Sequence, residues 1–204
     1  MNPRFPAVVL AALLAAPLLT PARAQSPQDL TSPPGDLPPR ERGEQTYSLD
    51  TLFAALKIAP DEASAKAIED RIWAVWTASG SDTCSLLMNR VKDAIDAKDY
   101  DLAIKLLDAI INIKPDYVEA WNRRATVYYL KQDYAHSIAD IAEVLAREPR
   151  HFGALSGLGM MLQEIGDDKD ALDAYRKALA IDPHLENIPD VVKTLSEKVE
   201  GRDI

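Results

Sequence analysis

Three prolines, Pro115, Pro149 and Pro183, recur at a spacing of 34 residues, and each one ends an apolar run. A fixed period of this length indicates one supersecondary unit that is stacked several times, so it constrains the fold more strongly than any single motif. Each unit in such a stack contacts only its neighbours along the array. With the first position set at Cys84, the period gives three units, residues 84–117, 118–151 and 152–185.

Each unit carries the signals of two amphipathic helices joined by a tight turn. Apolar residues at helical spacing form one stripe before the turn and another after it. The sixteenth position is always Asp, namely Asp99, Asp133 and Asp167, and an Asp there can cap the second helix by accepting bonds from unpaired backbone N–H groups. The proline stops that helix, because it cannot donate the backbone bond. Asp116 and Glu119 have the spacing of a capping box at the start of the second unit.

The residue types at several other positions also recur. Position four reads Leu87, Trp121 and Leu155, position eight reads Val91, Ala125 and Gly159, and position twenty reads Ala103, Ser137 and Ala171. On these residues the segment 84–185 resembles the tetratricopeptide repeat family. The resemblance implies an all-α fold, a right-handed α-solenoid of helix-turn-helix repeats that holds a protein or peptide partner in its concave face.

Two flanking segments complete the expected solenoid. Residues 47–80 contain two helical patterns separated by Pro60, which predicts a helical hairpin. Its place in the chain suggests a degenerate repeat stacked ahead of the first unit. Residues 187–201 predict one amphipathic helix that ends at Gly201, and an open solenoid requires such a polar-backed capping helix.

The first 24 residues have the pattern of a secretory signal peptide. Arg4 precedes an apolar run, and Ala22 and Ala24 form an A-x-A arrangement before Gln25. A membrane anchor is the alternative, but Pro17 interrupts the run short of the roughly 20 apolar residues that an anchor needs. We therefore expect cleavage, export to the periplasm of a Gram-negative bacterium, and no membrane span in the mature protein.

Residues 25–46 contain five prolines and few large apolar residues. A segment of this composition buries too little surface to offset the entropy of ordering, which predicts a flexible linker. A proline-rich recognition motif is the alternative interpretation.

The charge balance and the single cysteine exclude some classes of function. The formal net charge is −9, and the basic residues are interspersed among a larger number of carboxylates. A nucleic-acid partner is not expected, because binding a phosphate backbone requires clustered Lys and Arg. Cys84 is the only cysteine, so no intrachain disulfide forms, and we interpret it as a structural thiol.

No recognisable catalytic motif is present. His136, His151 and His184 fall on a helix face and at two inter-repeat turns without the spacing of metal ligands, and we interpret them as surface histidines. The sequence therefore predicts no catalytic, metal-binding or cofactor-binding residue, and a protein that is not an enzyme and needs no cofactor.

The resemblance also indicates where a partner would bind. In the family, positions two, five, six, nine, twelve and thirteen of each first helix face the concave groove. Here these positions hold a mixture of amides, cations, acids and apolar residues, and the Lys and Asn set that some members use to hold a peptide's terminal carboxylate is not reproduced. The predicted partner-binding residues are Asn89, Lys92, Asn122, Arg123, Tyr129, Met160 and Gln163.

Arginine replaces the usual apolar residue at position seven of the first two units, as Arg90 and Arg124. In an antiparallel hairpin whose turn is centred near Gln132, residue 124 lies level with Asp140. An ion pair between them is expected, because a partly buried Arg needs a paired acid. Arg90 has Leu106 at the matching place and therefore no predicted partner.

The expected function is that of an exported, non-catalytic scaffold that binds a protein or peptide in its groove, with a role in assembling cell-envelope complexes. The alternative is a structural module that forms homo-oligomers, in which the apolar stripe of residues 52–76 is exposed and pairs between copies.

Overall fold

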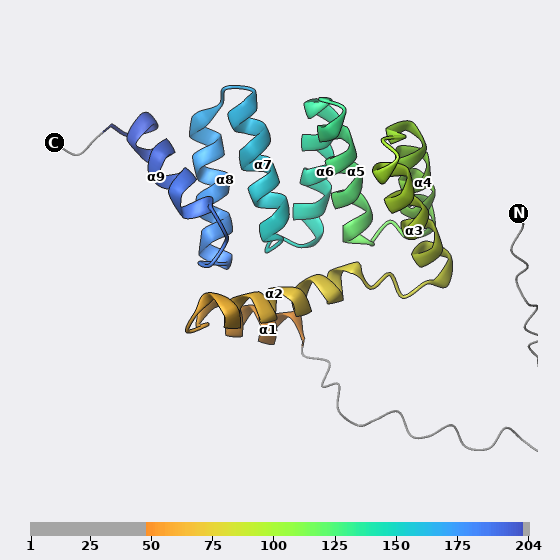
Figure 1. Cartoon of the computed structure of the whole chain (residues 1–204), viewed down its shortest axis with the longest axis horizontal. Helices are drawn as coiled ribbons and strands as arrows, with labels where there is room; N and C mark the ends of the chain where they lie inside the picture. The colour runs from red at the N-terminus through yellow and green to blue at the C-terminus, as the bar shows by residue number, and fades with distance from the viewer. Residues whose placement is uncertain (1–47, 202–204) are drawn as a thin grey trace, which may run out of the picture. The chain divides into compact units, whose positions relative to one another are not determined.

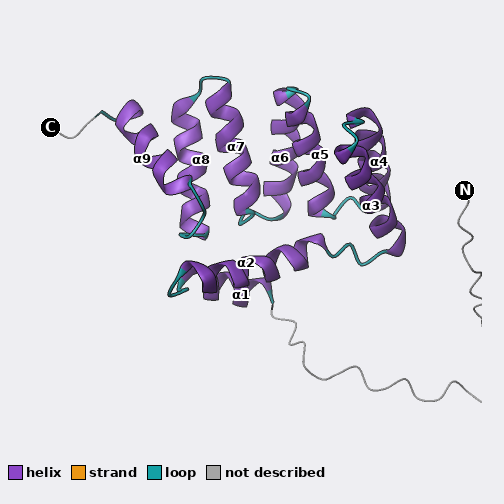
Figure 2. Cartoon of the chain, viewed as in Figure 1, coloured by secondary structure: helices purple, strands orange, loops and turns teal. Residues whose placement is uncertain are grey.

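The computed structural model describes residues 48–201, and within this range every regular element is an α-helix (Figure 2). The predicted signal peptide, residues 1–24, and the predicted linker, residues 25–46, lie outside the described residues. The helices are α1 (Leu49–Lys57), α2 (Glu62–Thr77), α3 (Asp82–Asp96), α4 (Tyr100–Ile113), α5 (Val118–Leu130), α6 (Tyr134–Arg147), α7 (Phe152–Glu164), α8 (Asp168–Ile181) and α9 (Ile188–Val199).

Three antiparallel hairpins, α3–α4, α5–α6 and α7–α8, stand side by side in chain order (Figure 1). The predicted all-α solenoid is confirmed. The helices of each pair fall at the places that the 34-residue period indicates, although α3 begins at Asp82, ahead of Cys84, because Ser81 caps it by accepting a bond from the backbone N–H of Cys84. In the second pair, positions eight and twenty are in close contact, because the Ser137 Oγ donates to the carbonyl of Ala125 at 2.7 Å.

The turn inside each hairpin has the same geometry. The side chains of Asp99, Asp133 and Asp167 accept bonds from the backbone N–H groups of Leu102, His136 and Asp170, so these residues cap the second helices. The residue before each of them has a positive φ, which is 57° at Lys98, 61° at Gln132 and 88° at Gly166. Two of the three turns therefore place a residue with a Cβ in the left-handed region, which favours glycine.

The predicted capping box at the start of the second unit is wrong. The N-cap of α5 is Tyr117, and its side chain makes no capping bond. The Tyr117 hydroxyl instead donates to the carbonyl of Thr77 at 2.7 Å, and Glu119 is buried, with only 3% of its surface exposed. The Tyr117 side chain therefore contacts the N-terminal hairpin, and the Glu119 carboxylate bonds Asn122 and Arg123 of its own helix.

The C-terminal helix α9 covers α8. Leu195 of α9 is buried in a cluster with Ala171, Leu172 and Tyr175. On the outside, both terminal nitrogens of Arg176 donate to the carboxylate of Glu200, at 2.6 and 2.7 Å. The helix thus packs an apolar face against the last repeat and turns a charged face outward, as a cap requires.

The N-terminal hairpin α1–α2 does not stack ahead of α3 as a preceding repeat would, so the predicted position was wrong. It crosses the ends of the repeats, where α2 contacts α5 and α1 contacts α8 (Figure 1). Its apolar stripe forms one buried cluster with Phe152, Ile181 and Leu185 of the third repeat. The hairpin lies there because these repeat ends offer an apolar surface large enough to bury the stripe.

Polar contacts fix the hairpin along the whole row. The Nζ of Lys114 donates to the carbonyl of Ser79 at 2.6 Å, and the Nη1 of Arg150 lies 2.6 Å from a carboxylate oxygen of Asp50. The ring of His184 lies 3.2 Å from the carbonyl of Ala59. These contacts join the hairpin to the ends of all three repeats.

Burial of the stripe removes the basis for self-association through residues 52–76. Its main members, Leu52, Phe53, Leu56, Ile72 and Trp76, are each at most 8% exposed within a single chain. An exposed apolar stripe was expected there, and the structure contradicts that expectation.

Candidate partner-binding face

The first helices of the three repeats, α3, α5 and α7, form one surface, which we call the first-helix face. Two hollows lie on it, one between α3 and α5 and the other between α5 and α7. Their volumes are about 220 Å³ and about 90 Å³. Pockets for small molecules usually measure roughly 300–1,000 Å³, so each hollow is better suited to a side chain of a partner that crosses the face.

The hollow between α3 and α5 is lined mostly by polar residues, two of them cations. Three predicted residues, Asn89, Lys92 and Arg123, line it together with the end of α2. The Nζ of Lys92 donates to Asp96 at 2.7 Å, and this bond raises the pKa of Lys92. Both cations keep exposed surface, 69% for the Lys92 side chain and 40% for that of Arg123.

A buried carboxylate underlies the first hollow. The two oxygens of Glu119 lie 2.9 Å from the Nε of Arg123 and 3.0 Å from the Nδ2 of Asn122. Burial nevertheless raises the pKa of Glu119, because desolvation outweighs these two partners. In this hollow the two cations, Lys92 and Arg123, are therefore accessible to a partner, whereas the carboxylate of Glu119 is buried.

The hollow between α5 and α7 is mostly apolar. Asn122, Tyr129 and Met160, three more predicted residues, line it, and sequence reasoning had not included the floor formed by Ile141 and Met161. Met160 is 44% exposed, although its side chain is large and apolar. An exposed apolar side chain beside an apolar hollow offers a contact for an apolar group of a partner.

A shared carboxylate orients the aromatic side of this hollow. The hydroxyls of Tyr129 and Tyr134 each donate to one oxygen of Glu164, both at 2.6 Å. These two bonds lower the pKa of Glu164, and the bond between Tyr129 and Glu164 raises the pKa of Tyr129 to about 12. Gln163, the remaining predicted residue, lines neither hollow, and its Oε1 accepts a bond from Tyr175 at 3.2 Å.

The N-terminal hairpin occupies one rim of the first-helix face. At position two of the repeats, Ser85 bonds the Ser79 hydroxyl at 2.8 Å, and a Cβ added to Gly153 would lie 2.9 Å from the Trp73 ring. Glu119 holds the same position in the second repeat, and it is buried. Position two was expected to be open to a partner; Trp73 of α2 closes it in the third repeat and Glu119 is buried in the second, whereas Ser85 in the first repeat stays exposed and lines the first hollow.

His151 is buried, and its interpretation as a surface histidine was wrong. Its ring is 0% exposed and stacks on Trp76, with 4.0 Å between the ring centroids and 7° between the planes. Its Nδ1 accepts a bond from the backbone N–H of Ala154 at 3.0 Å and so caps α7. Its Nε2 lies 4.0 Å from Glu119, and desolvation lowers the pKa of His151 to about 4.

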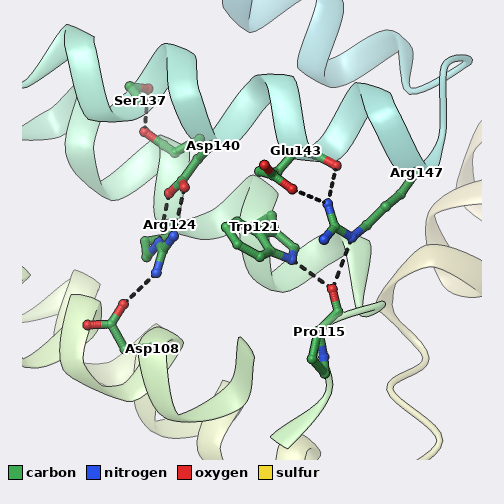
Figure 3. Close-up of polar contacts among 9 residues, drawn as sticks. Asp108, Pro115, Trp121, Arg124, Ser137, Asp140, Glu143 and Arg147 are labelled. Carbon is green, nitrogen blue, oxygen red and sulfur yellow. Dashed lines mark hydrogen bonds and ion pairs between the residues drawn. The ribbon is translucent and has the colours of Figure 1, made fainter. Parts of the chain in front are cut away.

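The ion pair between Arg124 and Asp140 is present (Figure 3). The Nε and Nη2 of Arg124 donate to the two oxygens of Asp140 at 2.8 and 2.7 Å. The Nη1 also donates to Asp108 of α4 at 2.6 Å, a partner from the preceding repeat that sequence reasoning missed. These bonds raise the pKa of Arg124, so it stays charged and ties the first two repeats together.

A second contact joins the same repeats (Figure 3). The carbonyl of Pro115 accepts bonds from the Nε1 of Trp121 and the Nε of Arg147, both at 3.0 Å. The Arg147 guanidinium also lies over the Trp121 ring, 4.8 Å from its centroid. The end of one repeat is therefore held by both helices of the next.

Among the described residues, no group of three or more His, Cys, Asp or Glu side chains is arranged to hold a metal ion. None of the helices in residues 48–201 combines the length and apolar character needed to cross a membrane.

A row of stacked helical hairpins with one hollowed face defines the class of α-solenoid repeat proteins. The tetratricopeptide repeat family model matches residues 88–144 and 131–186. A TPR repeat-containing protein of Rhizobium etli is 42% identical over 153 residues, which cover 75% of this chain and 75% of that protein. The chain therefore belongs to the tetratricopeptide repeat family.

Solved structures share the fold. The first TPR of Spaghetti (RPAP3) bound to an HSP90 peptide has a TM-score of 0.55 at 18% identity, over 59% of this chain and 95% of that chain. The Yersinia enterocolitica type III secretion chaperone SycD, in complex with a peptide of the translocator YopD, has a TM-score of 0.53 at 12% identity, over 58% of this chain and 95% of that chain.

Proposed function

We propose that this protein is an exported, non-catalytic binding module that holds a segment of a partner protein on its first-helix face. The observation that carries the proposal is the pair of side-chain-sized hollows formed by α3, α5 and α7. Similar solved structures contain a bound HSP90 peptide and a bound YopD peptide, which supports a peptide ligand as the class of partner.

The two hollows differ in chemistry, and this difference suggests the character of the segment. The first hollow presents Lys92 and Arg123 above a buried Glu119 and suits a polar or acidic side chain. The second, with Tyr129 and Met160, suits an aliphatic side chain. A partner segment with one polar or acidic side chain and one aliphatic side chain could fill both hollows as it crosses the face.

The rim covered by the hairpin narrows the surface that remains for a partner. Trp73 and Thr77 of α2 lie against the first turns of α7 and α5. A partner would therefore bind over the later turns of the first helices, where Asn89, Lys92 and Tyr129 lie. We expect a short segment to be recognised rather than a domain-sized surface.

Export is part of the proposal, and its support is the pattern of the first 24 residues. A short apolar run that ends in an A-x-A arrangement is typical of a signal peptide cleaved on secretion. The periplasm is then the proposed compartment, and assembly of a cell-envelope complex is the proposed role.

A pull-down that measures retention of the partner tests whether the first-helix face is the binding surface. The test compares the processed protein with a variant in which Lys92, Arg123, Tyr129 and Met160 are all replaced by Ala. A matched control replaces Asp173, an exposed residue on α8 that lines neither hollow. We expect the fourfold variant, once circular dichroism shows that it is folded, to lose the partner that both the unaltered protein and the Asp173→Ala control retain. Equal retention by all three proteins would show that the face is not the binding surface.

A further inference from the structure

The first repeat has an uncovered side. In the second and third repeats, one side of the first helix packs against the preceding hairpin, as α5 does on α4 and α7 does on α6. Because α1–α2 crosses the ends of the repeats instead of stacking ahead of α3, the same side of α3 has no such neighbour in the described part of the chain (Figure 1). We call this surface, with Leu86, Arg90 and Asp93 of α3 and its C-cap residue Ala97, the open edge.

Equivalent positions in the next repeats show what this side normally does. Leu86 is 63% exposed, whereas Ala120 and Ala154, at the same position of the second and third repeats, are 0% exposed. Asp93 is likewise exposed, whereas Val127 and Met161 at its position are buried. The open edge is thus a repeat-to-repeat interface that lacks its other half.

Arg90 is the most informative residue on this edge. Its equivalent in the second repeat, Arg124, bridges to Asp108 of the preceding repeat. Arg90 is exposed and makes no hydrogen bond or ion pair with any residue of the described range. Arg90 thus occupies the position at which Arg124 pairs with an acid of the preceding repeat, but no such acid lies beside it in the described range.

The second helix adds apolar surface to the same edge. Ile113 of α4 is 53% exposed. Its equivalent, Arg147, reaches back to the carbonyl of Pro115 in the preceding repeat, which shows that this position faces the preceding repeat. An open solenoid requires a polar outer face at its ends, and α9 supplies one at the other end of the row.

We infer that the open edge binds the open edge of a second copy of this chain. When two α3 helices pair antiparallel with their centre between Val91 and Lys92, Arg90 of each copy lies opposite Asp93 of the other. This twofold arrangement satisfies both charges at once, and self-complementarity is what a symmetric interface requires. A partner surface of a single charge would instead face either Arg90 or Asp93 with a like charge, which is unfavourable.

The same register places Leu86 opposite Ala97 of the other copy. Both residues are exposed in the single chain, and Ala97 is small enough to receive the larger side chain. The interface consists of one helical side per copy, so we expect a dimer whose population depends on protein concentration.

Sedimentation equilibrium of the full chain over a range of concentrations tests this inference. Arg90→Glu and Asp93→Arg should each weaken the dimer by roughly tenfold or more, because each replaces two attractive pairs by two repulsive ones. The double variant R90E/D93R should restore the dimer, since it only exchanges the two charges. Leu86→Glu should abolish it, and all variants should keep the thermal melting profile of the folded monomer.

A matched control replaces Ile58, which is 80% exposed at the end of α1 and remote from the open edge. Ile58→Glu should leave the dimer intact. Three outcomes would overturn the inference: a monomer at every concentration, a double variant that associates no better than the single ones, or a dimer that Ile58→Glu disrupts and Leu86→Glu does not.

Discussion

The buried pair of His151 and Trp76 makes the stability of this protein depend on pH in a predictable direction. The ordinary pKa of histidine is 6.5, and burial lowers the pKa of His151 in the folded protein to about 4. As the pH falls, the unfolded chain therefore takes up a proton before the folded chain does. The stabilisation from neutral, buried His151 is fully present above the unfolded-state pKa and is lost progressively between pH 6.5 and pH 4.

The size of the effect follows from the two pKa values. Between about pH 7.5 and about pH 5, this linkage removes roughly 2 kcal/mol of the free energy of unfolding. Glu119 acts in the opposite direction, because its raised pKa favours the neutral carboxyl, so its contribution improves as the pH falls. The variant His151→Asn isolates the histidine, since Asn can still cap α7 but does not titrate.

Urea unfolding of the unaltered protein and of His151→Asn, followed by circular dichroism at several pH values, measures the effect. The stability difference between the two proteins should shrink by roughly 2 kcal/mol between about pH 7.5 and about pH 5. The same comparison in a Glu119→Gln background removes the neighbouring carboxylate and should preserve the trend. A stability difference that does not change with pH would refute the burial of a neutral His151 beneath the hairpin.

Two further predictions concern the turns and the two ion pairs of Arg124. Gln132→Gly should raise the free energy of unfolding by up to about 1 kcal/mol because glycine adopts a positive φ without strain, and Gly166→Ala should lower it by about 1 kcal/mol for the opposite reason. Thermal unfolding measures both changes. A Gly166→Ala variant that is more stable than the unaltered protein would contradict the turn geometry. Asp140→Asn should lower the free energy of unfolding by about 3 kcal/mol, because it removes the buried charged partner of Arg124. Asp108→Asn should lower it by less than about 1 kcal/mol, because the Asp108 side chain is 46% exposed. Equal losses of stability for the two variants in urea unfolding would contradict this difference.

The sequence predicted the features that depend on neighbours in the chain. The 34-residue period located the three helix pairs, and the Asp caps follow from one residue and the N–H groups that come directly after it. The register of a single hairpin was enough to bring Arg124 to Asp140. Asp108 was missed because it belongs to the preceding repeat, and its place depends on how two repeats stack.

The position of the N-terminal hairpin could not be read in the same way. Consecutive helical pairs usually stack in order, and nothing local distinguishes residues 47–80 from a further repeat. The signal available was the excess of large apolar residues, with Trp73 and Trp76 both on the second helix, which a two-helix hairpin cannot bury by itself. The surface that buries them includes Phe152, and it exists only once the repeats are stacked.

The burial of His151 and Glu119 follows from the same long-range contact. Both residues lie near the start of a repeat, where a solenoid usually exposes its first turn. Trp76 of α2 stacks on His151 there, and Glu119 lies 4.0 Å from the His151 ring. Six of the seven predicted partner-binding residues line the hollows and are not covered by the hairpin, whereas Gln163 on the last turn of α7 lines neither hollow. The surface proposed for binding is therefore the part of the first-helix face that the chain leaves uncovered.

Site-specific photocrosslinking in intact cells tests the proposed binding face most directly. A photoreactive residue is placed at Met160 in the second hollow, at Asn89 in the first, and at Asp173 on α8 as the control. We predict partner adducts from Met160 and Asn89 and none from Asp173. Adducts from Asp173 alone would contradict the assignment of partner binding to the first-helix face.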